Sequence, residues 1–215
     1  MSTFAIALTC LLAAEPAAAA TPAKQLKPGE TLQLFDGKSL TGWQIAKFGG
    51  EGEVRVEEGK LILEMGSDMT GVTVAEGTTL PTVDYEVSLE AMRLDGSDFF
   101  CGLTFPVGDK TCSLIVGGWG GATVGLSSLN GADASENETT TYQEFDNDKW
   151  YKIRVRVTAK RIQAWIDDRK AADVDYTDKR VGIRSEVELS RPLGISNYAT
   201  KSALRTIEVK KLPAE

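Results

Sequence analysis

The sequence predicts an all-β protein, built as a two-sheet antiparallel jelly-roll sandwich. About a dozen short runs rich in β-branched and aromatic residues follow one another, separated by Gly, Asp and Asn. Several runs alternate strictly between apolar and polar residues, and no stretch of a dozen residues shows the 3.6-residue apolar period of a helix. Alternating strands bury one face each, so this many strands in one domain imply two stacked sheets around a shared core.

The alternating runs predict which side chains face that core. In 84–92 the apolar positions are Tyr85, Val87, Leu89 and Ala91. Residues 151–158 and 161–167 alternate in the same way and are expected to form a hairpin that turns at 159–160. Further strands are predicted at 54–56, 60–64, 71–75, 98–107, 111–117, 123–127, 180–184, 193–198 and 204–211.

The chain of 215 residues divides into a leader and one domain. An apolar run at 4–14 and the small residues 18–20 predict an export signal over 1–20, followed by a linker over 21–30 and a jelly-roll domain over 31–213. We therefore expect a bacterial protein that is periplasmic or secreted. Two alternatives stay open, namely an Ala-rich disordered leader and a lipoprotein anchor at Cys10.

Charge narrows the class of partner. The formal net charge is −7, and no cluster of Lys and Arg is evident that would offset it. An acidic surface repels phosphate backbones, so nucleic acid is not expected as a partner. No apolar stretch after residue 20 is long enough to span a membrane as a helix.

The two cysteines beyond the leader are predicted to be buried free thiols. If 108–109 is the turn between two neighbouring runs, Phe105 faces Cys112 and Cys101 lies four residues further along, roughly 13 Å away. A disulfide needs Cα atoms within about 7 Å. The chain contains no His, so a cysteine nucleophile activated by histidine is excluded.

Three neighbouring runs, 98–107, 111–117 and 123–127, turn mostly Gly, Ser and Thr away from the core. Small residues on an outer sheet face are expected to leave a hollow, and aromatic rings beside a hollow suit the C–H face of a sugar. The alternative is that 117–121 is a glycine-rich strand crossing with its Trp in the core. Trp165 is either a second stacking platform or a cover for neighbouring aliphatic stems. The predicted substrate-binding residues are Phe100, Ser113, Trp119, Ser127, Trp165 and Arg184.

Oxygen-rich segments of the sequence are candidate metal and acid sites. Asp146, Asn147 and Asp148 offer the oxygen ligands that calcium favours, although an Asx turn before a strand explains the same residues. Calcium or another divalent metal is thus a candidate cofactor with no assigned ligands. The neighbouring pairs 57–58 and 167–168 point to opposite strand faces, which makes them poor pairs for glycoside hydrolysis.

Residues 34–43, Leu-Phe-Asp-Gly-Lys-Ser-Leu-Thr-Gly-Trp, closely resemble the opening motif of the 3-keto-disaccharide hydrolase domain family. Segments 54–61, 84–90, 148–151 and 204–212 resemble later parts of that family in the same order. The resemblance implies a concanavalin-like or laminin-G-like jelly roll, exported by bacteria, that cleaves keto-sugar glycosides. In that chemistry a C3 ketone acidifies the neighbouring C–H, a base removes the proton, and the glycosidic oxygen leaves.

The chain departs from the family pattern at 96–106 and at 191–198, and without His the base must be another group. Asp98 and Glu144 are the predicted catalytic residues, with Glu86 as a further carboxylate. We expect the side chains of Asp98, Phe100, Trp119 and Arg184 to face one cleft. Three functions stay open: a keto-glycoside hydrolase or lyase, a non-catalytic saccharide-binding module, and a laminin-G-like cell-surface interaction domain.

Overall fold

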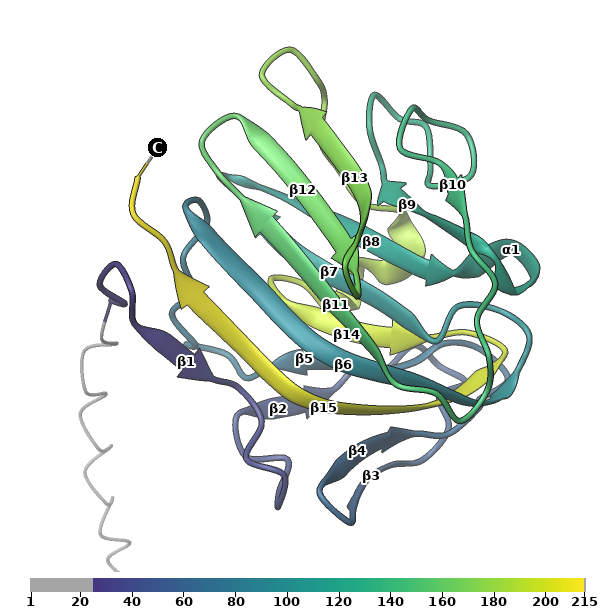
Figure 1. The fold of residues 1–215 in the computed structure, drawn as a ribbon. Coiled ribbons are helices and arrows are strands. Elements are labelled where there is room, and N and C mark those ends of the chain that lie inside the picture. The colour runs from purple at the N-terminus through teal and green to yellow at the C-terminus, as the bar shows by residue number, and fades with distance from the viewer. Residues whose placement is uncertain (1–24, 215) are drawn as a thin grey trace, which may run out of the picture.

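The computed structural model describes residues 25–214, which form two antiparallel β-sheets packed face to face (Figure 1). The predicted export signal, Cys10 and the first part of the linker lie outside the described residues. The eight-stranded sheet contains, in order, β13 (Arg169–Asp175), β12 (Arg161–Ile166), β11 (Tyr151–Val157), β6 (Tyr85–Gly96), β15 (Thr200–Lys211), β4 (Lys60–Leu63) and β3 (Val54–Glu57), with β1 (Thr31–Gln33) also paired to β15. The seven-stranded sheet contains β10 (Thr141–Tyr142), β9 (Thr123–Ser127), β8 (Lys110–Gly117), β7 (Cys101–Val107), β14 (Gly194–Asn197), β5 (Thr70–Val74) and β2 (Trp43–Ile45).

The predicted fold class is confirmed, and so is the alternation that defines the core. Tyr85, Val87, Leu89 and Ala91 on β6 are all buried between the sheets. The hairpin of β11 and β12 packs its apolar positions against the same core. Two short helical segments, α1 (Gly118–Gly121) and the 3₁₀ turn η1 (Ser185–Ser190), complete the described chain. Neither is long and apolar enough to cross a membrane.

One predicted strand is wrong. Residues 180–184 form a single bridge, between Val181 and Leu129, because this segment meets only the loop after β9. Conversely, the pattern missed β13, where Ala171 is an extra residue in the pairing with β12 and breaks the apolar alternation. The short strands β1, β2 and β10 were also missed, since two or three residues carry too little pattern to be recognised.

The cysteine prediction is confirmed in register and in chemistry. Phe105 pairs with Cys112 across β7 and β8, and Cys101 pairs with Val116 further along. Both cysteines are free and buried. Burial raises the pKa of the Cys112 thiol to about 12 and raises the pKa of Cys101 as well.

We therefore expect neither Cys101 nor Cys112 to react with a thiol reagent in the folded protein at pH 8, because the reactive thiolate is absent and access is blocked. Mature protein without Cys10 should release no thionitrobenzoate from Ellman's reagent when native, and two equivalents when denatured. Rapid labelling of the native protein would contradict this burial.

Candidate functional site

Two loops cover much of the outer face of the seven-stranded sheet. The first, 128–140, joins β9 to β10, and the second, 176–193, joins β13 to β14 and contains η1. A Cβ at Gly125 would lie 2.7 Å from the carbonyl oxygen of Ala134, and a Cβ at Gly194 would lie 2.6 Å from that of Ser190. The small residues of this face therefore make room for the covering loops rather than for a ligand.

This cover corrects two predicted binding residues. Ser113 and Ser127 point away from the core as expected, yet they are 1% and 2% exposed. The hydroxyl of Ser113 is hydrogen bonded to that of Thr104 at 2.8 Å. The sequence therefore predicted correctly on which face of the sheet these two serines lie. It did not predict that the covering loops keep them from a ligand, and neither serine lines the pocket.

The two covering loops are joined to each other. The backbones of Ser128 and Gly182 exchange hydrogen bonds of 2.7 and 3.1 Å. Beyond them, Arg184 Nη1 donates to Asp133 Oδ2 at 2.7 Å. These contacts connect segments that lie about fifty residues apart in sequence, and they hold Arg184 at the edge of the open part of the sheet.

A pocket of about 420 Å³ remains where the covering loops end. Its floor is Ile115 on β8, and its walls come from the turns before β5, before β7, after β8 and after β14, together with the start of η1. The lining residues are Asp68, Met69, Asp98, Phe99, Ile115, Trp119, Arg184, Glu186, Val187 and Tyr198. The structure thus brings together Asp98, Trp119 and Arg184 of the four residues that the sequence placed in one cleft.

Phe100 does not belong to this pocket, and its predicted role is wrong. Its side chain is fully buried in the core, with its ring centroid 5.1 Å from that of Phe145 and 5.9 Å from that of Tyr151. The strict alternation begins only at Cys101, because the chain bends where Asp98 Oδ1 accepts the backbone N–H of Phe99. The outward position is therefore occupied by Phe99.

Asp98 fixes the geometry of two aromatic walls. Its Oδ1 accepts the N–H of Phe99 at 2.8 Å, and its Oδ2 accepts the N–H of Gly120 at 3.1 Å. Trp119, between Gly118 and Gly120, has a left-handed φ of 48°, a conformation that costs free energy for a side chain with a Cβ. Trp119 is 45% exposed, so the interpretation of this turn as a strand crossing with a core Trp is wrong.

The charged groups of the pocket accept or donate hydrogen bonds within the protein. Arg184 Nη2 donates to Glu186 Oε1 at 2.7 Å, and Ser185 Oγ donates to Glu186 Oε2 at 3.1 Å. The Arg184 guanidinium lowers the pKa of the Glu186 carboxyl to about 2. Asp68 Oδ1 accepts the N–H of Met69 at 2.7 Å. The pocket therefore has an acidic rim of Asp68, Asp98 and Glu186 with one guanidinium among them.

Sequence reasoning missed Phe99 and Tyr198, whose rings stack with centroids 6.0 Å apart and an interplanar angle of 27°. Tyr198 could have been identified from strand alternation, because Gly194 and Ser196, four and two residues earlier, also face outward. Phe99 could not, since the bend at Asp98 breaks the alternation. Asp68 lies in a turn, where alternation makes no prediction.

The remaining predicted residues lie elsewhere. Glu144 is exposed and does not line the pocket. Trp165 lies on the outer face of the eight-stranded sheet, with Arg154, Arg156 and Lys170 positioned over its ring at 4.8 to 5.6 Å. Glu86 pairs with two of these cations, so it is remote from the pocket as well.

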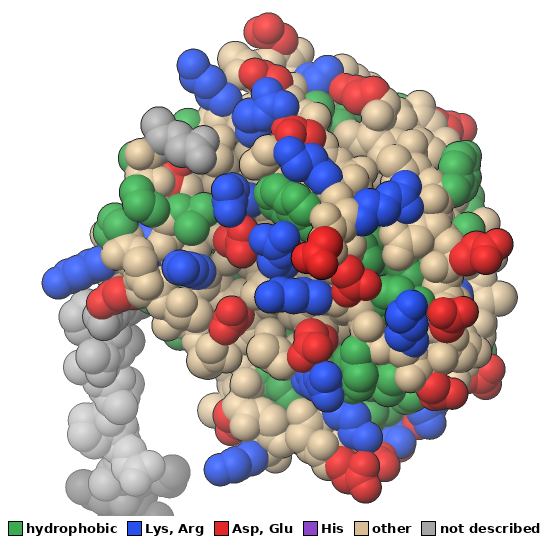
Figure 2. Space-filling view, viewed as in Figure 1, with side chains coloured by type: hydrophobic (Ala, Val, Ile, Leu, Met, Phe, Trp, Pro, Cys, Tyr) green, Lys and Arg blue, Asp and Glu red, His purple; other side chains and the backbone are tan. Residues whose placement is uncertain are grey.

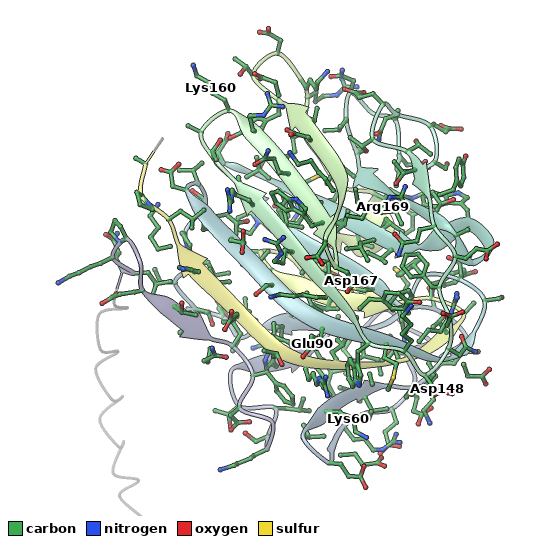
Figure 3. All side chains as sticks on the ribbon, in the orientation of Figure 1. Lys60, Glu90, Asp148, Lys160, Asp167 and Arg169 are labelled. Carbon is green, nitrogen blue, oxygen red and sulfur yellow. The ribbon has the colours of Figure 1, made fainter. Side chains whose placement is uncertain are left out.

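The Lys and Arg side chains around Trp165 on this face are paired with carboxylates, so the face is not a basic patch. Figure 2 shows it from the front, with basic and acidic side chains interspersed across the sheet. Figure 3 shows the same side chains as sticks, with Glu90 on β6 and Arg169 on β13 labelled. The basic residues that surround Trp165 cover its ring, which agrees with its interpretation as a side chain that packs on neighbouring stems.

The carboxylates of the described chain do not fit a metal ion. Within residues 25–214 no group of three or more Cys, Asp or Glu side chains could hold one. In the candidate segment, Asn147 Oδ1 accepts a hydrogen bond from Arg93 Nε at 3.0 Å, and Asp148 has a left-handed φ of 58°. These features are those of an Asx-rich turn.

Comparison with known proteins supports the fold and identifies a family. Residues 30–210 match the sequence profile of the 3-keto-alpha-glucoside-1,2-lyase-like domain, whereas no curated protein matches the chain. A Bacillus subtilis protein of unknown function with a galectin-like fold superposes with a TM-score of 0.58 at 12% identity, over 86% of this chain and 97% of its own.

Two further solved structures share the fold. The Crh5 transglycosylase in complex with NAG has a TM-score of 0.57 at 12% identity, covering 88% of this chain and 89% of its own. A structure from work on endo-acting O-glycanases of the human gut microbiota has a TM-score of 0.55 at 13% identity, covering 85% and 98%. At such identities these likenesses establish the architecture.

Proposed function

The chain belongs to the 3-keto-alpha-glucoside-1,2-lyase-like domain family, and from this membership we propose that it binds a 3-keto-glucoside in the pocket described above. One observation carries the proposal: Phe99, Trp119 and Tyr198 converge on a pocket that also contains three carboxylates. Aromatic faces take up the C–H faces of a sugar ring, and carboxylate oxygens accept its hydroxyl groups. An uncharged polyol suits the acidic rim, which would repel an anionic ligand.

The fold of the relatives agrees with this proposal. The Crh5 transglycosylase structure holds NAG, a sugar, and shares the two-sheet architecture with this chain. In the present chain the covering loops 128–140 and 176–193 close much of the outer sheet face. The ligand is therefore expected to contact one open pocket rather than a long groove.

Trp119→Ala is expected to weaken binding of methyl 3-keto-glucoside at least tenfold, because it removes an exposed stacking wall. Isothermal titration calorimetry on the mature protein measures the change. Trp165→Ala is the matched control, since it removes the same side chain from the other sheet. Equal losses in both variants, or saturable binding that Trp119→Ala leaves intact, would contradict the assignment of the pocket.

Cleavage of the bound glycoside is a second candidate function, favoured by the exposed carboxylate of Asp68 at the pocket. A carboxylate would take the proton from the carbon between the ketone and the anomeric carbon. The released electron pair would form a C=C bond as the anomeric C–O bond breaks, and the departing oxygen would then take up a proton. Release of the unsaturated keto-sugar by wild type but not by Asp68→Asn would establish this activity, and binding without any release would leave the binding function alone.

A laminin-G-like interaction domain, the third hypothesis, predicts a filled outer sheet face with a rim of loops. The covering loops do fill much of that face, but the aromatic pocket that remains favours a small ligand.

We also propose that the protein is exported with removal of residues 1–20. N-terminal sequencing of the protein from the producing bacterium tests this, and a retained Met1 would overturn it.

A further inference from the structure

We propose that the preferred ligand carries an aromatic aglycone rather than a second sugar, with the keto-sugar beside Trp119 and Asp98 and the aglycone on Phe99 and Tyr198. This inference rests on the proposed function, because it assigns the group attached to the same keto-glucoside. It depends on two observations: Asp98, Arg184 and Glu186 already have protein partners, and apolar surface extends from the pocket to its rim.

The polar side chains leave few partners for a second sugar. Both Asp98 oxygens accept backbone N–H groups. Arg184 donates to Asp133 and Glu186, and Glu186 also accepts from Ser185. A disaccharide presents hydroxyl groups on both rings, and each hydroxyl that loses water without gaining a partner costs free energy. The polar side chains of the pocket can therefore hydrogen bond the hydroxyl groups of one sugar ring more completely than those of two.

Apolar surface is concentrated at this pocket. Six of its ten lining residues are apolar or aromatic: Met69, Phe99, Ile115, Trp119, Val187 and Tyr198. Among residues 25–214, the large hydrophobic side chains that are exposed are Met65, Trp119, Tyr142, Leu189 and Tyr198. Trp119 and Tyr198 line the pocket, and Leu189 follows Val187 by two residues on η1. Exposed apolar groups that gather in this way indicate a binding surface for an apolar group.

The Phe99 side of the pocket is the more suitable for the aglycone. The stacked rings of Phe99 and Tyr198 form one continuous apolar wall, and Tyr198 is 44% exposed at the rim. The Met65 methyl group lies beside Gly96, which in turn packs on the backbone of Ala199, next to Tyr198. Trp119 instead neighbours Asp98, whose carboxylate retains lone pairs for a sugar hydroxyl. An aryl ring on the first wall would gain stacking without any need for hydrogen bonds.

The test compares three ligands on the mature protein by calorimetry: methyl 3-keto-glucoside, phenyl 3-keto-glucoside and a 3-keto-disaccharide. We expect the phenyl glycoside to bind at least tenfold more tightly than the other two. Tyr198→Ser should reduce affinity for the phenyl glycoside at least fivefold more than affinity for the methyl glycoside, and Tyr198→Phe should restore the preference. Tyr142→Ser, on β10 outside the pocket, is the control.

The outcomes separate this inference from the function on which it rests. If the disaccharide binds as tightly as the phenyl glycoside, or more tightly, the aglycone assignment is overturned while saccharide binding stands. If Tyr198→Ser weakens all three ligands by the same factor, the wall does not distinguish the aglycone, and the assignment is again overturned. If none of the three binds, both proposals fall.

Discussion

Phe100→Ala is expected to lower the free energy of unfolding by about 3–5 kcal/mol, the usual cost of deleting a buried aromatic ring. Phe100 is fully buried and packs edge-on against Phe145. Its removal leaves a cavity between the sheets that rigid neighbouring strands cannot close. Urea denaturation followed by fluorescence measures the change, and the wild-type slope of free energy against denaturant should be preserved.

Phe99→Ala is the matched comparison, because the same substitution one residue earlier changes a pocket wall instead of the core. We expect it to cost well under half the stability lost in Phe100→Ala and to weaken binding of phenyl 3-keto-glucoside, whose aryl ring would rest on Phe99. Phe100→Ala, once folded below its denaturation midpoint, should still bind the keto-glucoside. If Phe99→Ala instead lost stability and Phe100→Ala lost binding, the assignment of Phe99 to the pocket and Phe100 to the core would be contradicted.

Asp98→Ala is expected to reduce keto-glucoside affinity at least tenfold, corresponding to about 1.4 kcal/mol. The substitution removes the acceptor for two backbone N–H groups, and hydrogen bonds to a charged group are worth about 1.5–3 kcal/mol each. Without the bond to Gly120, the left-handed turn at Trp119 loses a contact that opposes its strain. Calorimetry gives the affinity. Trp fluorescence anisotropy, compared with that of a Trp119→Phe variant because the chain has four Trp residues, reports whether the Trp119 side chain becomes more mobile.

Asp98→Asn separates positioning from proton transfer. An amide oxygen can still accept the N–H of Phe99 or of Gly120, so a positioning role predicts affinity between that of wild type and Asp98→Ala. If Asp98 were instead the base for glycoside cleavage, the Asn variant would bind normally and release no product. Glu144→Ala is the control for removing a carboxylate, because Glu144 is exposed and outside the pocket lining.

Much of the fold could be predicted because strand residues obey a period of two. The register of β7 against β8, with Phe105 opposite Cys112, followed from one assumed turn. The error at Phe100 arose where a side chain, Asp98, supplied the hydrogen bond that bends the chain. An irregularity of one residue reverses the sheet face to which the adjoining side chains point. Alternation therefore predicts the face of a residue reliably only within a continuous strand.

The candidate site was harder to predict, since most of its residues come from turns and from the start of η1. Asp98, Trp119 and Arg184 were identified from residue type, but the distances between them depend on which turns meet at one end of the sheet. The small outward residues illustrate a second limit. Gly125 and Ser113 give the same pattern for an open hollow as for a face covered by a loop, and only the packing of Ala134 on Gly125 distinguishes the two.

The bond between Arg184 and Asp133 connects two surface loops while the strands beneath take no part in it. Insertions or deletions in 128–140 would therefore be transmitted to the mouth of the pocket through that bond, with the sandwich left intact. Ligand choice in this architecture can thus diverge between relatives faster than the scaffold does, because the segments that shape the entrance are not the ones on which folding depends.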